Sequence, residues 1–477
     1  MRKTGGFRYF FSVCYAIIGG ASLLFSEYFL LAHCLILVAL FQIIDKLSKG
    51  IVIRETMAFL YSFTCVYMPL FGYTRFNRYN FLAQIWIRYM MVQPETYYGY
   101  ALPAISFFCF GATLPTRRDL GDEVQKLILQ LKAKLLVSPK VGLYIVGIGL
   151  LSITINKFLP SALQYFFSLF FFSSFAGVLY IYFSPSFKMK KLILFGFVAF
   201  IVVSALRSGM FTLIAYMGAT IFSFFFLKKR ISLLRKTTII ALAAFFLIMI
   251  QSVKQSYRVL LWSGNIEGNV ASVYSRLLLD KMRDLDKVLT DEMFFPIYYR
   301  TNQGFNVNLV MLKYPAKAPY DEGKKLAVDV LASFVPRFLW PDKPMAGGKE
   351  NMLYYADYRL IGYSTNVGPL GESYGGFGPV WGVVFMFVLG LFIRWCYIIV
   401  FKIAYKTPAF ICWLPVLFYQ VVYSAETDTL QIFNSVVKTG AFIVIIYFAF
   451  PKVFFSTGIF ASRRKAARKS QSLLEVG

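Results

Sequence analysis

The sequence has few charged residues and almost no histidine. Charged residues make up 15% of the 477 residues and hydrophobic residues 58%, whereas a soluble domain carries roughly 25% charged residues. This composition excludes a soluble globular protein and indicates that lipid solvates most of the chain. The only histidine is His33, inside an apolar run. A single histidine in that place excludes a histidine-ligated metal cluster, a Ser-His-Asp triad and histidine acid-base catalysis.

Cysteine pairs and a glycine-rich phosphate loop are missing too. All six cysteines lie in apolar runs and none forms a CxxC pair, which excludes a disulfide framework and a zinc site of that kind. The glycines of Gly371–Gly378 follow no strand pattern and lead into an apolar run, so they are not a dinucleotide-binding fingerprint. We therefore expect no metal and no other cofactor.

Long apolar runs recur along the chain instead. Each run of about 18 or more apolar residues is a candidate span, and a span must be helical because lipid cannot satisfy the hydrogen bonds of its backbone. We predict an all-α polytopic membrane protein with about twelve transmembrane helices. They lie near residues 9–25, 28–45, 56–73, 96–114, 141–158, 161–184, 191–206, 209–227, 237–253, 379–400, 408–424 and 430–450.

The distribution of lysine and arginine predicts the orientation, because cytoplasmic loops hold these residues in excess. In a model with about twelve spans, every strongly basic segment falls on one side, and both termini are cytoplasmic. These segments are the N-terminus, an amphipathic segment at 115–140, the clusters at 188–191 and 228–230, and a basic tail at 453–477. The net charge of +27 is thus dispersed over short loops. It does not form the basic face that nucleic-acid binding needs.

Four regions follow from this topology. Residues 1–253 form an N-terminal membrane part of about nine spans, and residues 379–452 form the last three spans, before the tail at 453–477. Between them lies a large, mainly helical extracytoplasmic loop, 254–378, with 15 lysines and arginines against 13 aspartates and glutamates. Helix-like patterns run through Ala271–Leu289 and Gly323–Phe334. A loop of this length that is rich in aromatic residues is expected to be ordered and functional.

Cationic side chains of the loop and the span ends are candidates for binding an anion at membrane level. Arg207 interrupts an apolar run, and an arginine there either snorkels to the interface or pairs with an anion. Guanidinium groups bind phosphate oxygens with two parallel hydrogen bonds, and a cluster of cations stabilises a diphosphate leaving group. The candidate diphosphate-binding residues are Arg207, Lys254, Arg258, Arg300 and Arg337.

Three features together resemble a known family. They are the outer arginine Arg207, the segment VPRFLWPDKP at 335–344 and the segment GPLGESYGGFG at 368–378, which leads into a span. With the topology, they resemble the O-antigen, or oligosaccharide repeat-unit, polymerases of the Wzy type. The spacing Arg-x10-Gly of that family also occurs, at Arg207/Gly218 and Arg337/Gly348. In a chain with 33 glycines such matches arise by chance.

The resemblance implies a glycosyltransferase of the bacterial inner membrane. Such an enzyme transfers a growing glycan from undecaprenyl diphosphate to the non-reducing end of a lipid-linked repeat unit on the periplasmic face. Its partners would be this lipid-linked oligosaccharide, the bilayer and a chain-length regulator protein. The reaction favours a carboxylate that takes the acceptor proton, for which we select Glu372. The alternative for Glu372 is a carboxylate at a helix N-terminus, where the helix dipole favours it.

Aromatic and amide side chains of the loop are candidates for contacts with sugars. The aromatic candidates, whose rings would stack on sugar faces, are Tyr354, Tyr355, Tyr358, Tyr374 and Phe377. The amide candidates for sugar specificity are Asn302, Gln303, Asn306 and Asn366.

Two other acidic pairs compete with Glu372. Glu426 and Asp428 lie between the last two spans and are the stronger alternative. Carboxylates at membrane level cost free energy, so they usually have a function. Asp284 and Asp286 lie among lysines and arginines, as on a solvated helix face. Either pair is an alternative site for a divalent metal. The first outer loop has a single acidic residue, Glu27, where many lipid-phosphate sugar transferases carry an acidic pair, and this favours the polymerase.

Two alternative functions remain open. An O-antigen ligase would use the same arginines but resembles a pattern with a periplasmic histidine, which this sequence does not have. A flippase or exporter of lipid-linked oligosaccharide would carry charged residues along a cavity in both halves of the chain. Here the candidate charges concentrate at the outer end of the second half.

Overall fold

The computed structural model describes residues 9–116, 121–209, 211–227, 229, 231–264, 269–283, 290–335, 337, 339–361 and 364–456. Within these residues the only regular secondary structure is helical. The chain divides into two compact units. The first comprises Met1–Gly121, Gly196–Cys396 and Phe418–Asn434, and the second comprises Asp122–Phe195, Tyr397–Leu417 and Ser435–Gly477.

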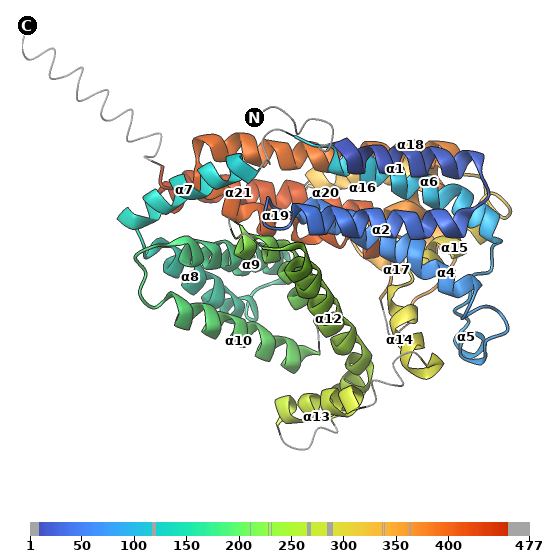
Figure 1. Cartoon of the computed structure of the whole chain (residues 1–477), viewed down its shortest axis with the longest axis horizontal. Coiled ribbons are helices and arrows are strands. Elements are labelled where there is room, and N and C mark those ends of the chain that lie inside the picture. The colour runs from blue at the N-terminus through green and yellow to red at the C-terminus, as the bar shows by residue number, and fades with distance from the viewer. Residues whose placement is uncertain are drawn as a thin grey trace, which may run out of the picture. The chain divides into compact units, whose positions relative to one another are not determined.

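The first unit begins with a bundle of helices that includes α1, α2, α3 and α6 (Figure 1). The bounds of its first helices are α1 Phe10–Leu24, α2 Tyr28–Lys46, α3 Ile53–Ser62, the π-helical turn η2 Phe63–Tyr67, α4 Met68–Tyr73, α5 Phe81–Ile85 and α6 Pro94–Thr113. Glycine allows α6 to approach α18 (Gly368–Lys406) closely. A Cβ atom at Gly111 would lie 2.8 Å from the carbonyl oxygen of Phe387, and one at Gly390 would lie 2.4 Å from that of Phe108. Small residues at helix contacts are typical of membrane bundles.

The helices of the predicted large loop belong to the first unit as well. They are α13 Val270–Arg283, α14 Asp291–Thr301, α15 Gly304–Lys313, α16 Lys324–Phe334 and α17 Gly348–Ala356. The two helix-like patterns in the sequence are confirmed as α13 and α16, although residues 284–289 of the first pattern lie outside the described residues. The remaining helices of the first unit before and after this segment include η4 Leu213–Met217, α11 Gly218–Phe222, η5 Ser223–Phe226, α12 Leu233–Trp262, the 3-10 turn η8 Ser424–Glu426 and α20 Thr429–Asn434.

The second unit contains α7 Gly121–Val137, α8 Val141–Asn156 and α9 Ser161–Phe183. Helices α8 and α9 pack closely, because a Cβ atom at Gly142 would lie 2.8 Å from the carbonyl oxygen of Gly177. Helix α7 lies within the predicted amphipathic segment at 115–140, and its apolar face is buried. Three helices extend across the limits of the units, namely α10 Lys190–Ser208, α18 and α19 Leu414–Val422. The second unit also contains η7 Pro408–Trp413, η9 Ser435–Thr439, α21 Gly440–Ala449 and η10 Pro451–Phe454.

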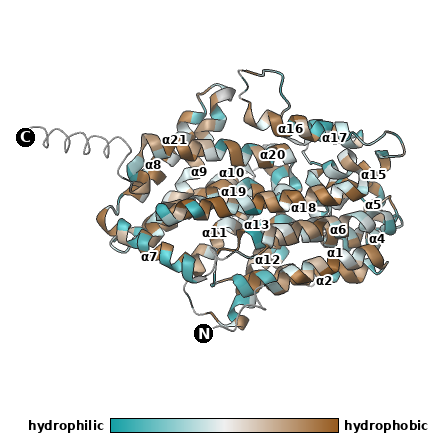
Figure 2. Ribbon diagram, turned by 90° about the horizontal axis from the view of Figure 1, so that it is seen from above, coloured by the Kyte–Doolittle hydropathy of each residue, from teal (hydrophilic) through white to brown (hydrophobic). Residues whose placement is uncertain are grey.

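Seven helical segments in the described part of the chain are long and apolar enough to cross a membrane. They are Tyr28–Lys46, Leu163–Phe183, Lys190–Ser208, Leu233–Lys254, Gly368–Lys406, Pro408–Glu426 and Thr429–Ala449. A bent pair, Asp122–Val137 and Val141–Asn156, makes up to eight, and Phe10–Leu24 and Leu213–Phe226 are shorter apolar helices. Figure 2 shows hydrophobic residues along the long helices and hydrophilic residues on α7, α16 and α17. The helical membrane fold is confirmed, whereas the number of twelve spans stays a prediction.

The predicted limits of the large loop, 254–378, do not coincide with the outermost helix ends, although an apolar segment ends at Lys254 and α18 breaks at Gly378. Helix α12 continues from Lys254 to Trp262, and α18 already begins at Gly368. The glycine-rich segment before Gly378 is therefore helical. The backbone breaks at Gly378, where φ is 72°, before Pro379. Glycine tolerates this positive φ, and the proline that follows has no N–H to donate.

Candidate functional site

A polar cavity of about 240 Å³ lies within the first unit, where several helices end. Lys254 and Glu426 are the last residues of two apolar segments, and Thr429 is the first residue of another. Arg300 is the penultimate residue of α14. The side chains and backbone that line the cavity are those of Thr212, Arg300, Gln303, Ala346, Gly347, Gly348, Ser364, Thr365, Asn366, Tyr423, Glu426, Thr427, Asp428 and Gln431.

Two adjacent glycines bring two segments of the cavity wall together. Gly347 has a φ of 137°, a conformation that side chains rarely adopt. A Cβ atom at Gly348 would lie 1.4 Å from the carbonyl oxygen of Thr365, so only glycine fits between the segments 346–348 and 364–366. Asn306 fixes the second segment, since its amide donates to Thr365 Oγ1 and to the carbonyl oxygen of Asn366, both at 2.8 Å.

Asp428 joins this wall to helix α20. Its Oδ1 accepts from the backbone N–H of Gln431 at 2.5 Å, the contact of an N-cap residue. Its Oδ2 accepts from the backbone N–H of Gly347 at 2.8 Å and from the side chain of Asn366 at 2.9 Å. Burial raises the pKa of Asp428 above its usual value, although these hydrogen bonds act in the opposite direction. Because both of its oxygens accept from the protein, Asp428 supports the cavity wall.

Glu426 is the other carboxylate of the cavity, and it is only partly buried. Its Oε1 accepts from the hydroxyl of Tyr216 at 2.5 Å. The ring of Tyr216 stacks on that of Tyr423, with centroids 4.8 Å apart and planes inclined by 21°. A hydrogen bond from a phenol fixes one carboxylate oxygen and leaves Oε2 available to a ligand. Glu426 is thus the cavity residue that fits an acid-base role.

Cations gather beside Glu426. Arg300 lines the cavity, and Lys254 lies close by with 6% of its surface exposed. The charges that act most strongly on the Lys254 ammonium are those of Arg300, Arg258 and Glu426. Arg258 stacks on Trp262, with 4.9 Å from Cζ to the ring centroid, and its Nε donates to the carbonyl oxygen of Gly209 at 2.7 Å. Arg300 acts electrostatically on both Lys254 and Arg258. Such a group of cations favours an anionic ligand, although the cavity also holds the carboxylates of Glu426 and Asp428.

Neither of the two other predicted diphosphate-binding arginines lines the cavity. Arg207 is exposed at the end of α10, and the backbone beside it contacts the end of α12, where Arg258 donates to the carbonyl oxygen of Gly209. Arg337 is exposed and donates to the carbonyl oxygens of Pro341 and Lys343, at 2.8 and 3.2 Å. It therefore holds its own turn together.

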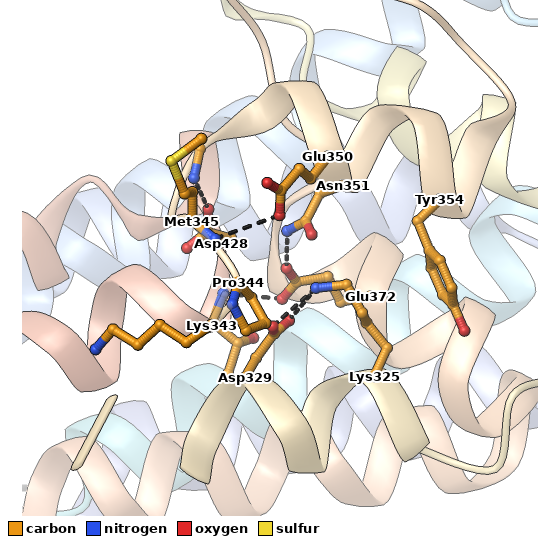
Figure 3. A network of polar contacts seen from close by, with 12 residues as sticks. Lys325, Asp329, Lys343, Pro344, Met345, Glu350, Asn351, Tyr354, Glu372 and Asp428 are labelled. Carbon is orange, nitrogen blue, oxygen red and sulfur yellow. Dashed lines mark hydrogen bonds and ion pairs between the residues drawn. The ribbon is translucent and has the colours of Figure 1, made fainter. Parts of the chain in front are cut away.

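Glu372, the predicted catalytic base, lies next to the cavity wall but does not line it. Its carboxylate is fully buried, and Oε1 accepts from Asn351 Nδ2 at 2.6 Å while Oε2 accepts from the backbone N–H of Thr429 at 2.8 Å. Figure 3 shows Asn351 and Glu372 pointing toward one another, beside the ion pair of Lys325 and Asp329. The geometry thus favours a structural role for Glu372, in which it fixes α17 and α18 to the start of α20.

The five predicted sugar-stacking aromatics also do not line the cavity. Tyr374 is buried against Tyr100 and Tyr320, and Tyr355 is fully buried. Phe377 fills the space above Gly323, where a Cβ atom would lie 2.3 Å from its ring. Two others, Tyr354 and Tyr358, are exposed. Figure 3 shows the ring of Tyr354 pointing away from the carboxylates, and its hydroxyl donates to Asp321 Oδ2 at 3.2 Å.

Two of the four amide candidates line the cavity, and several polar residues at the cavity or beside it were not predicted from the sequence. Gln303 and Asn366 line it, whereas Asn302 and Asn306 are buried behind its wall. Thr212, Tyr216, Tyr423 and Gln431 were not selected from the sequence. Polar side chains within or beside apolar runs are the signal that points to them, since such residues in a membrane helix are often functional.

Among the described residues, no group of three or more histidine, cysteine, aspartate or glutamate residues is placed to hold a metal ion. Asp284 and Asp286, one of the acidic pairs considered for a metal, lie outside the described residues. Comparisons with protein-family models, with curated proteins and with solved structures find no match to this chain. The function must therefore be argued from the cavity and the fold.

Proposed function

We propose that this protein is a glycosyltransferase of the bacterial inner membrane that polymerises O-antigen or another surface polysaccharide. It transfers a growing glycan from undecaprenyl diphosphate to the non-reducing end of a lipid-linked repeat unit. The observation that carries the proposal is the polar cavity at the ends of apolar segments, with Glu426 beside Arg300 and Lys254. A substrate with a lipid tail, a diphosphate and a sugar needs these three environments next to one another.

The proposed topology puts this cavity on the extracytoplasmic face. About twelve spans, with both termini cytoplasmic, leave the basic loops inside and segment 254–378 outside. Lys254 ends the ninth proposed span, and Glu426 to Thr429 connect the last two. At the opposite end of α12, Lys236 donates to the carbonyl oxygens of Ile44 and Asp45, at 3.0 and 3.2 Å. The basic cluster at 228–230 precedes this end in the sequence.

Each group of the cavity has a part in the proposed reaction. The acceptor hydroxyl oxygen forms a bond to the anomeric carbon of the donor sugar, and the bond from that carbon to the diphosphate oxygen breaks. The hydroxyl proton passes to Glu426, and undecaprenyl diphosphate leaves with the bonding electron pair. Arg300 and Lys254 stabilise the charge that develops on the diphosphate. Gln303, Asn366 and Gln431 supply donors and acceptors for sugar hydroxyls.

The size of the cavity fits the reacting groups alone. At about 240 Å³ it is smaller than typical ligand pockets, which span roughly 300–1,000 Å³. The cavity therefore receives the donor diphosphate and the sugars that react, while the remaining glycan extends beyond it. A chain-length regulator is proposed as a partner, by resemblance alone.

The test is a reaction with purified components. The full chain in nanodiscs is incubated with undecaprenyl-diphosphate-linked repeat units, and the glycans are separated on a gel. We expect a ladder of products that differ by one repeat unit. A single unextended band with folded protein would contradict the proposal, and transfer onto added lipid-A core without a ladder would identify a ligase.

A further inference from the structure

Tyr216 makes the one side-chain hydrogen bond that the described structure gives to Glu426, and it does so from outside the cavity. Its hydroxyl donates to Oε1 at 2.5 Å, and its ring stacks on Tyr423, which lines the cavity. Tyr423 in turn packs against Tyr419, with ring centroids 5.3 Å apart. The phenol is thus held by ring contacts as well as by the carboxylate, which fixes the position of both groups.

The backbone around Tyr216 is unusual in a way that bears on this contact. Tyr216 belongs to η4, a single π-helical turn at Leu213–Met217 that continues directly into α11. A π-helical turn widens the helix and rotates its side chains relative to an α-helix, and such turns occur frequently at functional sites. Thr212, just before this turn, lines the cavity. The turn therefore borders the cavity and presents the phenol to its carboxylate.

We infer that Tyr216 is a positioning residue for the proposed reaction, which holds Glu426 oriented so that Oε2 receives the acceptor proton. This inference rests on the proposed function. The hydrogen bond from the phenol fixes Oε1, and the orientation of Oε2 follows from it. Without the phenol, the carboxylate of Glu426 would be free to rotate and would present Oε2 to the acceptor hydroxyl for only part of the time. The phenol acts through Glu426 and does not itself contact substrate.

The charges around Glu426 agree with this assignment. Lys254 and Arg300 act on it from one side, and Asp428 is the other carboxylate of the cavity. The oxygens of Asp428 accept from Gly347, Asn366 and Gln431, so it is already fixed by backbone and amide donors. Tyr216 fixes Glu426 in the same way, but through a hydroxyl that the substitution Tyr216→Phe removes without changing the ring.

The experiment measures kcat and KM of ladder formation for Tyr216→Phe. Phenylalanine keeps the ring that stacks on Tyr423 and removes only the hydroxyl. We expect kcat to fall about tenfold, the effect of losing one hydrogen bond to a charged group. KM for the acceptor should change little, because the phenol does not contact substrate.

The matched control is Tyr274→Phe. Tyr274 is also buried against aromatic rings, but its hydroxyl has no hydrogen-bond partner among the described residues and it does not line the cavity. Its kcat and KM should be those of the unaltered protein. An unchanged kcat for Tyr216→Phe, with a ladder still formed, would overturn the inference while the proposed function stands. A protein that forms no ladder in any form would instead contradict the proposed function.

A second comparison separates positioning from a general effect on the fold. If Tyr216 acts only through Glu426, Tyr216→Phe should cause no further loss in a Glu426→Gln background, so the two effects are not additive. Full additivity would overturn the inference. Replacement of Tyr216 by a fluorinated tyrosine, a hydrogen-bond donor of nearly the same shape, should keep kcat near that of the unaltered protein. A loss as large as that of Tyr216→Phe would also contradict the inference.

Discussion

At the residue scale, the cavity depends on side chains that are far apart in the sequence. Arg300 comes from α14, Thr212 precedes a π-helical turn, and Glu426 ends a 3-10 turn. Lys254 comes from α12, and the charges of Arg300 and Glu426 act on its ammonium group. No short sequence motif predicts such a site, because its residues come from segments that lie far apart in the sequence. Its parts can be tested separately.

The first prediction concerns Arg300. Arg300→Ala removes a guanidinium group from the cavity, and loss of one donor to a developing negative charge lowers turnover on the order of a hundredfold. The matched control is Arg283→Ala, since that side chain is 82% exposed. The measurement is the rate of ladder formation at equal protein abundance. Equal rates for both variants, or a larger loss in Arg207→Ala than in Arg300→Ala, would contradict the placement of the diphosphate.

The second prediction distinguishes the two candidate bases. Glu426→Gln should lower turnover by about a hundredfold, the effect of losing a general base. Glu372→Gln should leave turnover near that of the unaltered protein, because Gln keeps the shape and Asn351 can turn its amide to preserve the contact. Single-turnover rates measure the difference. The reverse result would restore the base role predicted from the sequence for Glu372.

The sequence indicated which residue types matter but could not decide which of them meet. Arg300, Lys254, Gln303 and Asn366 were among the candidates and lie at the cavity or beside it. Arg337 was chosen for the same charge, yet it donates to carbonyl oxygens of its own turn. Charge and aromatic character can be read from a chain, whereas the contacts that occupy a side chain depend on tertiary packing.

At the element scale, the apolar runs predicted the helices well and their ends poorly. Apolar periodicity ends where lipid ends, but α12 remains helical for two further turns to Trp262. Nothing in hydropathy requires a helix to stop at the membrane surface, since backbone hydrogen bonds along the helix stabilise it in water too. The backbone breaks at Gly378, the predicted end of the loop, but the residues before this break, 368–377, are helical as well.

The third prediction concerns the contact of α6 with α18. Gly390→Ala would place a Cβ atom 2.4 Å from the backbone oxygen of Phe108, which cannot move without shifting α6. We expect a loss of about 1–3 kcal/mol in the free energy of unfolding. Gly20→Ala in α1 is the control, since a Cβ atom there has no neighbour within 4 Å. Thermal unfolding in nanodiscs measures both, and equal melting temperatures would show that α6 and α18 are not closely packed.

At the scale of the whole molecule, buried carboxylates link the loop helices to the ends of the apolar segments. Asp329 on α16 pairs with Lys325 at 2.8 Å and is influenced by Asp428 and Glu350, while Asp428 holds the segments 346–348 and 364–366. Burial raises the pKa of both aspartates above their usual values. The folded protein therefore binds these two protons more tightly than the unfolded chain does.

The fourth prediction is the resulting pH dependence of stability. Below the ordinary aspartate pKa, both aspartates are protonated in the folded and in the unfolded state, and their contribution to the free energy of unfolding is complete. As the pH rises through the raised pKa values it is lost, by at most about 1.4 kcal/mol per pH unit for each group. Melting temperatures of the protein in nanodiscs should decline as the pH rises from the ordinary aspartate pKa, about 3.8, through the raised pKa values. Asp329→Asn should flatten this decline, and an unchanged slope in that variant would contradict the assignment.

The side of the membrane on which the cavity lies can be determined directly, and the proposed function requires the outer side. A lipid-linked glycan is extended outside the cytoplasm, so α17, which begins at the cavity wall, must be outside, whereas the basic segment that forms α7 must be inside. The fifth prediction uses a chain whose six cysteines are replaced, with one new cysteine at the exposed Lys349 or Leu129. A maleimide that cannot cross membranes should label Lys349→Cys in intact cells, but Leu129→Cys only after lysis. Labelling of Leu129→Cys in intact cells, with Lys349→Cys protected, would reverse the topology. In that case Glu426 and Arg300 would face the cytoplasm, where the proposed substrate is assembled and not polymerised.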